Sequence, residues 1–254
     1  MATMEQIRER VRSEDYAFLQ TNRHLGNNVI LLGVGGSHAY GTSVDKSDID
    51  LRGIALNTKS EILGSHMFQA VTDEATDTVI FSVNKAIDLL SSCNPNALEM
   101  LGLRPEHYLH LTTIGEELIA NRKLFLSKLA VNTFGGYANG MLKRMENEAV
   151  ASHKMSKHMM HAIRLYLMGI DVLEKEEIVT YREDDLQFLL DVRSGSLLTE
   201  DGKVSERFYE LINEYETRLQ QAVKTTTLPD RPDYNAIMDL RTSINERVVL
   251  GNAL

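Results

Sequence analysis

The segment from Gly36 to Gly53 constrains the chain more than any other part of its sequence. It reads GSHAYGTSVDKSDIDLRG, a Gly-Ser pair followed, after ten intervening residues, by a pair of aspartates. Residues 29–34 before it read VILLGV, an aliphatic run typical of a buried strand. Glycines let the chain turn there, and Ser37 can cap a short helical turn over residues 38–40. The free N–H groups of such a turn can bind an anion such as phosphate.

The paired aspartates are Asp48 and Asp50, in a second strand predicted over residues 47–56. Because side chains alternate between the faces of a strand, Asp48, Asp50 and Arg52 share one face. Carboxylates packed so closely repel each other unless a cation or water separates them. Mg²⁺ prefers oxygen ligands and keeps open positions for phosphates, so it is the natural partner. An isolated Asp-x-Asp is more often a solvated strand edge, but the preceding Gly-Gly-Ser favours a metal and phosphate site.

The pattern GSHAYGT followed by SDIDLRG resembles the signature of the DNA polymerase beta nucleotidyltransferase superfamily. Within it, the chain resembles predicted nucleotidyltransferases of bacteria and phages whose substrate is not settled. The resemblance implies that Gly36 and Ser37 contact the phosphates of a nucleotide. It also implies that Asp48 and Asp50 hold two Mg²⁺ ions.

Members of this superfamily usually add a third acid from a neighbouring strand, which binds the metal that activates the incoming hydroxyl. We expect Asp77 in this role, because it opens a strand predicted over residues 76–83, before a helix from about residue 84. A plain strand-entry aspartate is the alternative for Asp77, and Glu74 is the alternative third acid. Glu99 matches a further segment of the family, and we expect it in a structural or substrate-facing role within a helix that Pro95 starts.

The composition indicates a globular protein without a membrane span. At 254 residues, 43% of them hydrophobic, the chain can form one large domain or two small ones. Its longest apolar runs are far too short to cross a bilayer. A net charge of −9 argues against non-specific coating of nucleic acid, while leaving room for a local basic groove. Cys93 is the single cysteine, which excludes an internal disulfide and favours a reducing cytoplasm, and we expect it to pack among helices.

A change of pattern near residues 103–106 divides the chain into a predicted nucleotidyltransferase domain, residues 1–112, and a helical domain, residues 113–254. Residues 1–10 predict a charged amphipathic helix that either packs on its own domain or mediates a dimer. After the division the apolar spacing is helical, and a proline-rich loop is expected over residues 228–233. Helices are predicted at residues 127–148, 152–173, 183–194, 203–225 and 234–250. The fold class is therefore α+β, a small mixed β-sheet with flanking helices followed by an α-helical bundle.

The helix predicted over residues 152–173 carries a basic stripe at intervals of three and four residues. The members of this stripe are Lys154, Lys157, His158, His161 and Arg164. The last four match a pattern found in the same predicted family, and the resemblance implies contact with the triphosphate or an acceptor phosphate. A solvated helix face with half-buried histidines is the alternative. Zinc binding by the two histidines is a weaker interpretation, since no adjacent glutamate or cysteine completes a ligand set.

Two arginines and two tyrosines complete the candidates. Arg182 and Arg193 also resemble family positions, and Gly195 is predicted to end a helix. Arg193 would then either compensate the helix dipole in the last turn or bind phosphate. Tyr40 and Tyr137 are candidates for stacking on a base, with core packing as the alternative, and Tyr40 ranks higher because it lies in the phosphate-binding turn.

These patterns predict a metal-dependent nucleotidyltransferase. Two Mg²⁺ ions on Asp48, Asp50 and Asp77 would bind an NTP, most simply ATP, an acceptor hydroxyl would attack the α-phosphorus, and pyrophosphate would leave. Arg52 and the basic stripe would stabilise negative charge. The acceptor stays open among a small molecule, a protein hydroxyl and an RNA or tRNA 3′ end. A non-catalytic nucleotide sensor or toxin-neutralising module is the alternative class, although the complete set of acids favours catalysis.

Overall fold

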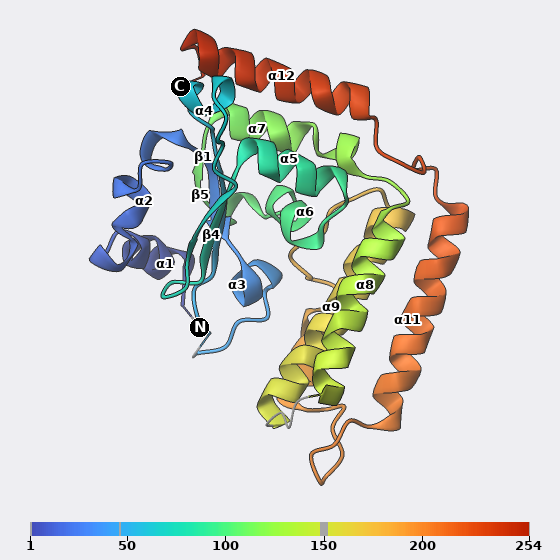
Figure 1. The fold of residues 1–254 in the computed structure, drawn as a ribbon. Coiled ribbons are helices and arrows are strands. Elements are labelled where there is room, and N and C mark those ends of the chain that lie inside the picture. The colour runs from blue at the N-terminus through green and yellow to red at the C-terminus, as the bar shows by residue number, and fades with distance from the viewer. Residues whose placement is uncertain (1, 46, 148–151, 254) are drawn as a thin grey trace.

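A five-stranded sheet in the order β3-β4-β2-β1-β5 forms the centre of the N-terminal half. The computed structural model describes residues 2–45, 47–147 and 152–253. Figure 1 shows the sheet between two groups of helices. The pair β2 and β4 runs parallel, whereas the other neighbouring pairs run antiparallel. This mixed sheet with its helices confirms the predicted α+β class. The strands are β1 (Val29–Val34), β2 (Leu51–Ala55), β3 (Ala70–Asp73), β4 (Thr78–Ser82) and β5 (Tyr108–Leu111).

Three neighbouring strands have their termini at the same end of the sheet. Strand β1 has the predicted bounds, but β2 begins only at Leu51, so Asp48 and Asp50 lie in the loop before it. Val34 pairs with Leu51, and Leu51 pairs with Thr78. The end of β1 therefore lies beside the starts of β2 and β4, and the segments that carry the glycines and the acids are neighbours in space.

Helices cover both faces of the sheet (Figure 1). On one face, α1 (Met4–Val11) and α2 (Phe18–Thr21) pack over β1 and β5. A capping box at Thr3 starts α1, and fully buried Ile7 packs it on its own half of the chain. The other face carries α5 (Val83–Ser91), α6 (Pro95–Leu101) and α7 (Thr113–Ala120). A Cβ at Gly115 of α7 would lie 2.3 Å from the Ile30 carbonyl oxygen, which shows how closely α7 approaches β1.

The helical half follows the predicted segments. It consists of α8 (Ala130–Asn147), α9 (Ser152–Glu174), α10 (Leu186–Ser194), α11 (Glu206–Thr225) and α12 (Tyr234–Leu250). Helices α8, α9 and α11 lie side by side, whereas α12 returns to pack on α5 and α4 (Lys59–Leu63) (Figure 1). The predicted end of the first of these helices, at Glu148, lies outside the described residues.

The hydrophobic core is continuous between the two halves. One cluster of buried residues runs from Ile30 of β1 and Ile87 of α5 to Phe134 of α8 and Phe208 of α11. Such continuity makes the halves support each other, because removing one would expose apolar surface on the other. The domain division between residues 112 and 113 stays a prediction. In the described parts of the chain, each helix is too short or too polar to cross a bilayer.

The packing of α12 on the N-terminal half can be tested with one substitution at two positions. Leu240 is 8% exposed and belongs to the continuous core, whereas Leu250 is 72% exposed. We expect Leu240→Ala to lower the free energy of unfolding by about 2–4 kcal/mol, because it leaves a cavity. Leu250→Ala should change it by less than about 0.5 kcal/mol. Chemical denaturation measures both, and equal losses would contradict the packing of α12.

Candidate active site

Asp50 and Asp77 come together where β2 and β4 begin. Asp50 directly precedes β2, and Asp77 ends the turn between β3 and β4 with a φ of 44°. This left-handed conformation is one that aspartate tolerates better than most residues. The Leu51 N–H donates to the Asp77 carbonyl oxygen at 3.2 Å, so the two acids are held by the same backbone contact. Burial, the nearby Asp77 charge and a hydrogen bond with its side chain raise the pKa of Asp50 to about 7.

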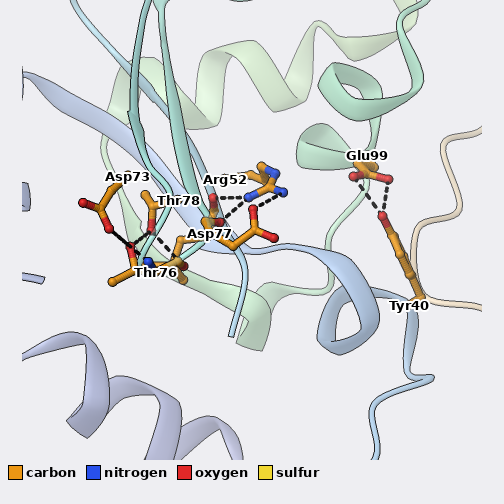
Figure 2. Close-up of polar contacts among 8 residues, drawn as sticks. Tyr40, Arg52, Asp73, Thr76, Asp77, Thr78 and Glu99 are labelled. Atoms are coloured by element: carbon orange, nitrogen blue, oxygen red, sulfur yellow. Dashed lines mark hydrogen bonds and ion pairs between the residues drawn. The ribbon is translucent and has the colours of Figure 1, made fainter. Parts of the chain in front are cut away.

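Arg52 fixes the Asp77 side of this pair (Figure 2). Its Nη2 lies 3.0 Å from Asp77 Oδ1, and its Nη1 donates to the carbonyl oxygens of Asp77 and Leu51 at 2.5 and 2.8 Å. A Cβ built on Gly35 would lie 2.8 Å from Arg52 Cγ and 3.5 Å from Asp50 Cβ. Arg52 and Asp50 therefore flank the same glycine, although Asp50 lies in the loop before β2 and not on the predicted strand face.

Gly36 lets the Asp50 carboxyl approach the backbone of α3 (Gly36–Tyr40). Its φ is +54°, and a Cβ at this position would lie 1.6 Å from Asp50 Oδ2. Helix α3 confirms the predicted helical turn and ends at Gly41, whose φ is +82°. The N–H groups of the first turn, including that of buried Ser37, thus lie beside the acids. An anionic phosphate and a cation fit together at such a place.

The turn that contains Asp77 has its own support. The Asp73 carboxylate accepts hydrogen bonds from the N–H and hydroxyl of Thr76, at 3.0 and 2.8 Å (Figure 2). Glu74, the alternative third acid, is exposed in the same turn. It is Asp77 whose charge and side chain act on Asp50. The geometry thus favours Asp77 over Glu74 as the third acid.

The acid pair suits a divalent cation, because a cation can replace the shared proton between two oxygen ligands. Asp48 is exposed in the loop before Asp50. Within the described residues, no three His, Cys, Asp or Glu side chains stand together as a metal site. This holds for Asp48 with the acid pair and for His158 with His161. Metal binding by the three aspartates therefore stays a prediction.

A buried polar network lies behind α3 and joins three elements. The Tyr40 hydroxyl of α3 lies 3.1 and 2.9 Å from the two carboxylate oxygens of Glu99 in α6 (Figure 2). Arg164 of α9 lies 3.3 Å from Glu99 Oε2, and its guanidinium carbon lies 3.6 Å from the centre of the Tyr40 ring. Burial raises the pKa of Glu99, and the Arg164 charge opposes this effect. Helix α6 begins at Pro95, as predicted, and places Glu99 inside the fold.

The basic stripe runs from the solvent-exposed start of α9 into the core. Lys154 and Lys157 are exposed, His158 and His161 are half-buried, and Arg164 is buried. Burial, together with the charges of Arg164 and Lys157, lowers the pKa of His161 well below its usual value. Burial and Asp77 raise the pKa of Asp50, and the Lys157 charge opposes this effect, so Lys157 is near enough to act on the acid pair.

The other candidate arginines contact protein groups. Arg193, in the last turn of α10 before the left-handed Gly195, donates to the Thr42 carbonyl oxygen at 2.8 Å. Its Nη2 lies 3.4 Å from Ser47 Oγ, so Arg193 ties down the loop that leads to the acids. Buried Arg182 pairs with Asp171 and Asp185.

The remaining candidates have structural contacts. Cys93 is buried with its Sγ 3.2 Å from the Phe125 carbonyl oxygen, as its predicted packing role requires. The Tyr137 hydroxyl accepts a hydrogen bond from Asn94 at 2.8 Å, next to the start of α6. The Tyr40 ring is 5% exposed, and Arg164 covers it. The roles of Tyr40, Arg164 and Arg193 in nucleotide binding stay predictions.

Comparison with known families identifies the family of the chain. The model of the RNA repair pathway DNA polymerase beta family (RlaP) matches residues 7–242 of the chain. The chain therefore belongs to this family, whose activity is of the polymerase beta nucleotidyltransferase type. No curated protein matches the chain. The match runs from α1 into α12 and includes both the acid pair and the helical half.

Sequence reasoning did not find the Tyr40, Glu99 and Arg164 network. Each residue stood out separately, as a stacking candidate, a helix residue and a member of the basic stripe. Their contacts join positions 59 and 65 residues apart. The one available signal was the presence of charged residues within apolar helical patterns, because buried charges require partners.

The pairing of Asp50 with Asp77 predicts a titration that depends on both. Asp77→Asn removes the neighbouring charge, so the pKa of Asp50 should fall from about 7 towards its ordinary value. The matched substitution Glu74→Gln should leave it unchanged, because that side chain lies in the same turn without acting on Asp50. Carboxyl ¹³C NMR titration of the metal-free protein measures the midpoint. A larger change with Glu74→Gln would assign the third acid to Glu74.

The close approach at Gly36 predicts an unusually costly methyl group. Gly36→Ala places a Cβ on the Asp50 carboxyl and in a left-handed conformation, so we expect a loss of about 2 kcal/mol in the free energy of unfolding. Gly140→Ala in α8 is the control, since a Cβ there meets nothing within 4 Å. It should stabilise the protein by about 0.5–1 kcal/mol through helix propensity. Equal effects in urea denaturation would show that Asp50 does not lie against Gly36.

Proposed function

We propose that the protein transfers a nucleoside monophosphate from an NTP, with ATP as the first candidate, to a hydroxyl group and releases pyrophosphate. One observation carries the proposal, namely that the acid pair lies against the first turn of α3. Asp50 and Asp77 come from separate segments, yet their carboxyl groups interact directly. Membership of the polymerase beta family supports the same reaction class.

The chain's own groups divide the work of binding the donor. The N–H groups of Gly36 and Ser37 would hold phosphate oxygens at the start of α3. Asp50 and Asp77 would hold Mg²⁺, with Asp48 as a further ligand. When bound, Mg²⁺ would neutralise the charge that develops during phosphoryl transfer. Arg52 keeps Asp77 in place through the contacts to its carboxylate and carbonyl oxygens.

The basic stripe provides positive charge opposite the acids. Exposed Lys157 can reach a phosphate, while half-buried His161 stays neutral because burial and neighbouring cations lower its pKa. A neutral imidazole can donate one hydrogen bond and accept another, so His161 suits a hydroxyl group as well as a phosphate. We assign Lys157, His158 and His161 to the triphosphate or the acceptor phosphate.

The acceptor hydroxyl, we propose, belongs to an RNA end. The description of the matching family refers to an RNA repair pathway, and the basic stripe supplies a local site on an otherwise acidic chain. A small molecule and a protein hydroxyl are the alternatives that a transfer assay distinguishes. We also propose a cytoplasmic setting, because the single thiol, Cys93, is buried and needs no oxidised partner.

Removal of the Asp50 charge should separate activity from stability. We expect Asp50→Asn to lower transfer of labelled nucleotide at least roughly 100-fold, since the proposed cation site loses a charged ligand. The melting temperature should stay equal or rise, because the repulsion between the two acids is relieved. Asp239→Asn, on the exposed side of α12, is the matched control and should retain full transfer. Unchanged transfer by Asp50→Asn would reject the mechanism.

An acceptor screen tests the second half of the proposal. Labelled ATP is offered with an RNA oligonucleotide, with tRNA and with a small-molecule extract, and the labelled product identifies the acceptor. RNA binding should weaken steeply with salt and with Lys157→Gln, because phosphate contacts release counterions. Persistent ATP binding in calorimetry without any labelled product would instead favour a nucleotide sensor.

A further inference from the structure

We infer that Tyr40, Glu99 and Arg164 form a positioning network through which the helical half holds α3 against the acid pair. This inference deepens the proposed function and rests on it for its kinetic consequences. None of the three side chains needs to touch the reacting atoms. Their proposed role is to set where the first turn of α3 lies relative to Asp50.

Helix α3 is too short to hold its own position. It spans Gly36–Tyr40, and an isolated helix of this length is not stable in water. Its N-terminal end lies at Asp50, whereas its C-terminal end is fixed by residues of the helical half. The Tyr40 carbonyl oxygen accepts from the Arg182 N–H at 3.2 Å, and the Tyr181 ring packs against Gly41.

The network adds a rigid contact at this C-terminal end. Arg164 stacks on the Tyr40 ring at 3.6 Å and pairs with Glu99, while Glu99 accepts from the Tyr40 hydroxyl at 2.9 and 3.1 Å. Each partner thus contacts both of the others. A ring fixed on its face by Arg164 and at its hydroxyl by Glu99 has little freedom to rotate or slide. The orientation of α3 is consequently coupled to α6 and α9.

Stability alone does not explain these charges. The side chains of Glu99 and Arg164 are each 5% exposed, and the Nε atom of Arg164 is buried without a hydrogen-bond partner in the described residues. Buried ion pairs of this kind are often no more stabilising than apolar residues of similar volume, because both charges lose hydration. A directional role accounts better for a buried ion pair that also holds a tyrosine hydroxyl.

The network also interacts electrostatically with Arg52, which contacts the acid pair. Burial raises the pKa of both Glu99 and Tyr40, the Arg52 charge opposes this effect at each, and the same guanidinium pairs with Asp77. Figure 2 draws the contacts of Arg52 with Asp77 and the separate contact of Tyr40 with Glu99 in one view. Displacement of α3 would therefore disturb the acids directly through Gly36 and indirectly through Arg52.

The test replaces the whole ion pair, since removing one partner would strand a buried charge. Glu99→Leu combined with Arg164→Met keeps the volume similar and should fold. We expect amide hydrogen exchange of residues 36–41 to accelerate about tenfold or more while β1 and α9 stay protected, because only α3 is released. The KM for ATP should rise about tenfold, since the phosphate-binding turn is displaced. The single variant Arg164→Lys, which keeps the charge beside Glu99, should raise the KM for ATP less than the double variant does.

The matched control is the double variant Glu174→Leu with Arg218→Met. This pair also joins α9 to another helix through two contacts, of 3.0 and 2.6 Å, but it does not touch α3. It should change neither the exchange of residues 36–41 nor the KM for ATP. The inference would be overturned if amide exchange in the Glu99 and Arg164 double variant accelerated equally throughout the protein. It would also be overturned if exchange at residues 36–41 did not change. If residues 36–41 exchange faster in the variant but the wild-type protein transfers no nucleotide, the proposed function is rejected and the positioning role still holds.

Discussion

The approach of the Asp50 carboxyl to Gly36 and Asp77 is the constraint on which the rest of the site depends. A side chain at position 36 would occupy the place of the carboxylate, so the chain uses a left-handed glycine there. The approach places two acids side by side and raises the pKa of Asp50 to about 7. The two acids share a hydrogen bond, and they repel each other when both are ionised. Such local strain clusters at functional sites.

The helical half supports this arrangement from two directions. Arg193 holds the loop before the acids through the Thr42 carbonyl oxygen, and Arg164 holds the end of α3 through Tyr40. Both arginines are therefore engaged with the protein, whereas Lys157 stays exposed towards solvent. The stripe thus changes character along α9, from exposed lysines for which we propose phosphate contacts to a structural contact at its buried end. Residues of one stripe thus differ in role according to whether they are exposed or buried.

Much of the fold followed from local pattern. The aliphatic run of β1, the capping glycine at Gly195 and the apolar periodicity of the later helices have short-range causes, so their positions agree with expectation. The start of β2 was wrong by four residues, because the alternation of Asp48 and Asp50 resembles a strand although pairing begins at Leu51. Strands β3 and β5 were missed. Both are four-residue edge strands, with too few residues for a clear period and with pairing that depends on a partner.

The sequence by itself determined the family, the glycine and acid motif, and the helical character of the second half, because each depends on residues close together in the chain. Tertiary structure decided which acid meets Asp50, since the turn between β3 and β4 brings Asp77 to the start of β2 and leaves Glu74 exposed. It also decided that Tyr40, Glu99 and Arg164 form one network. Their contacts depend on how three separate elements pack, and no local spacing encodes that. The Gly36 motif therefore predicts the chemistry, while the packing of the helical half holds α3 beside Asp50.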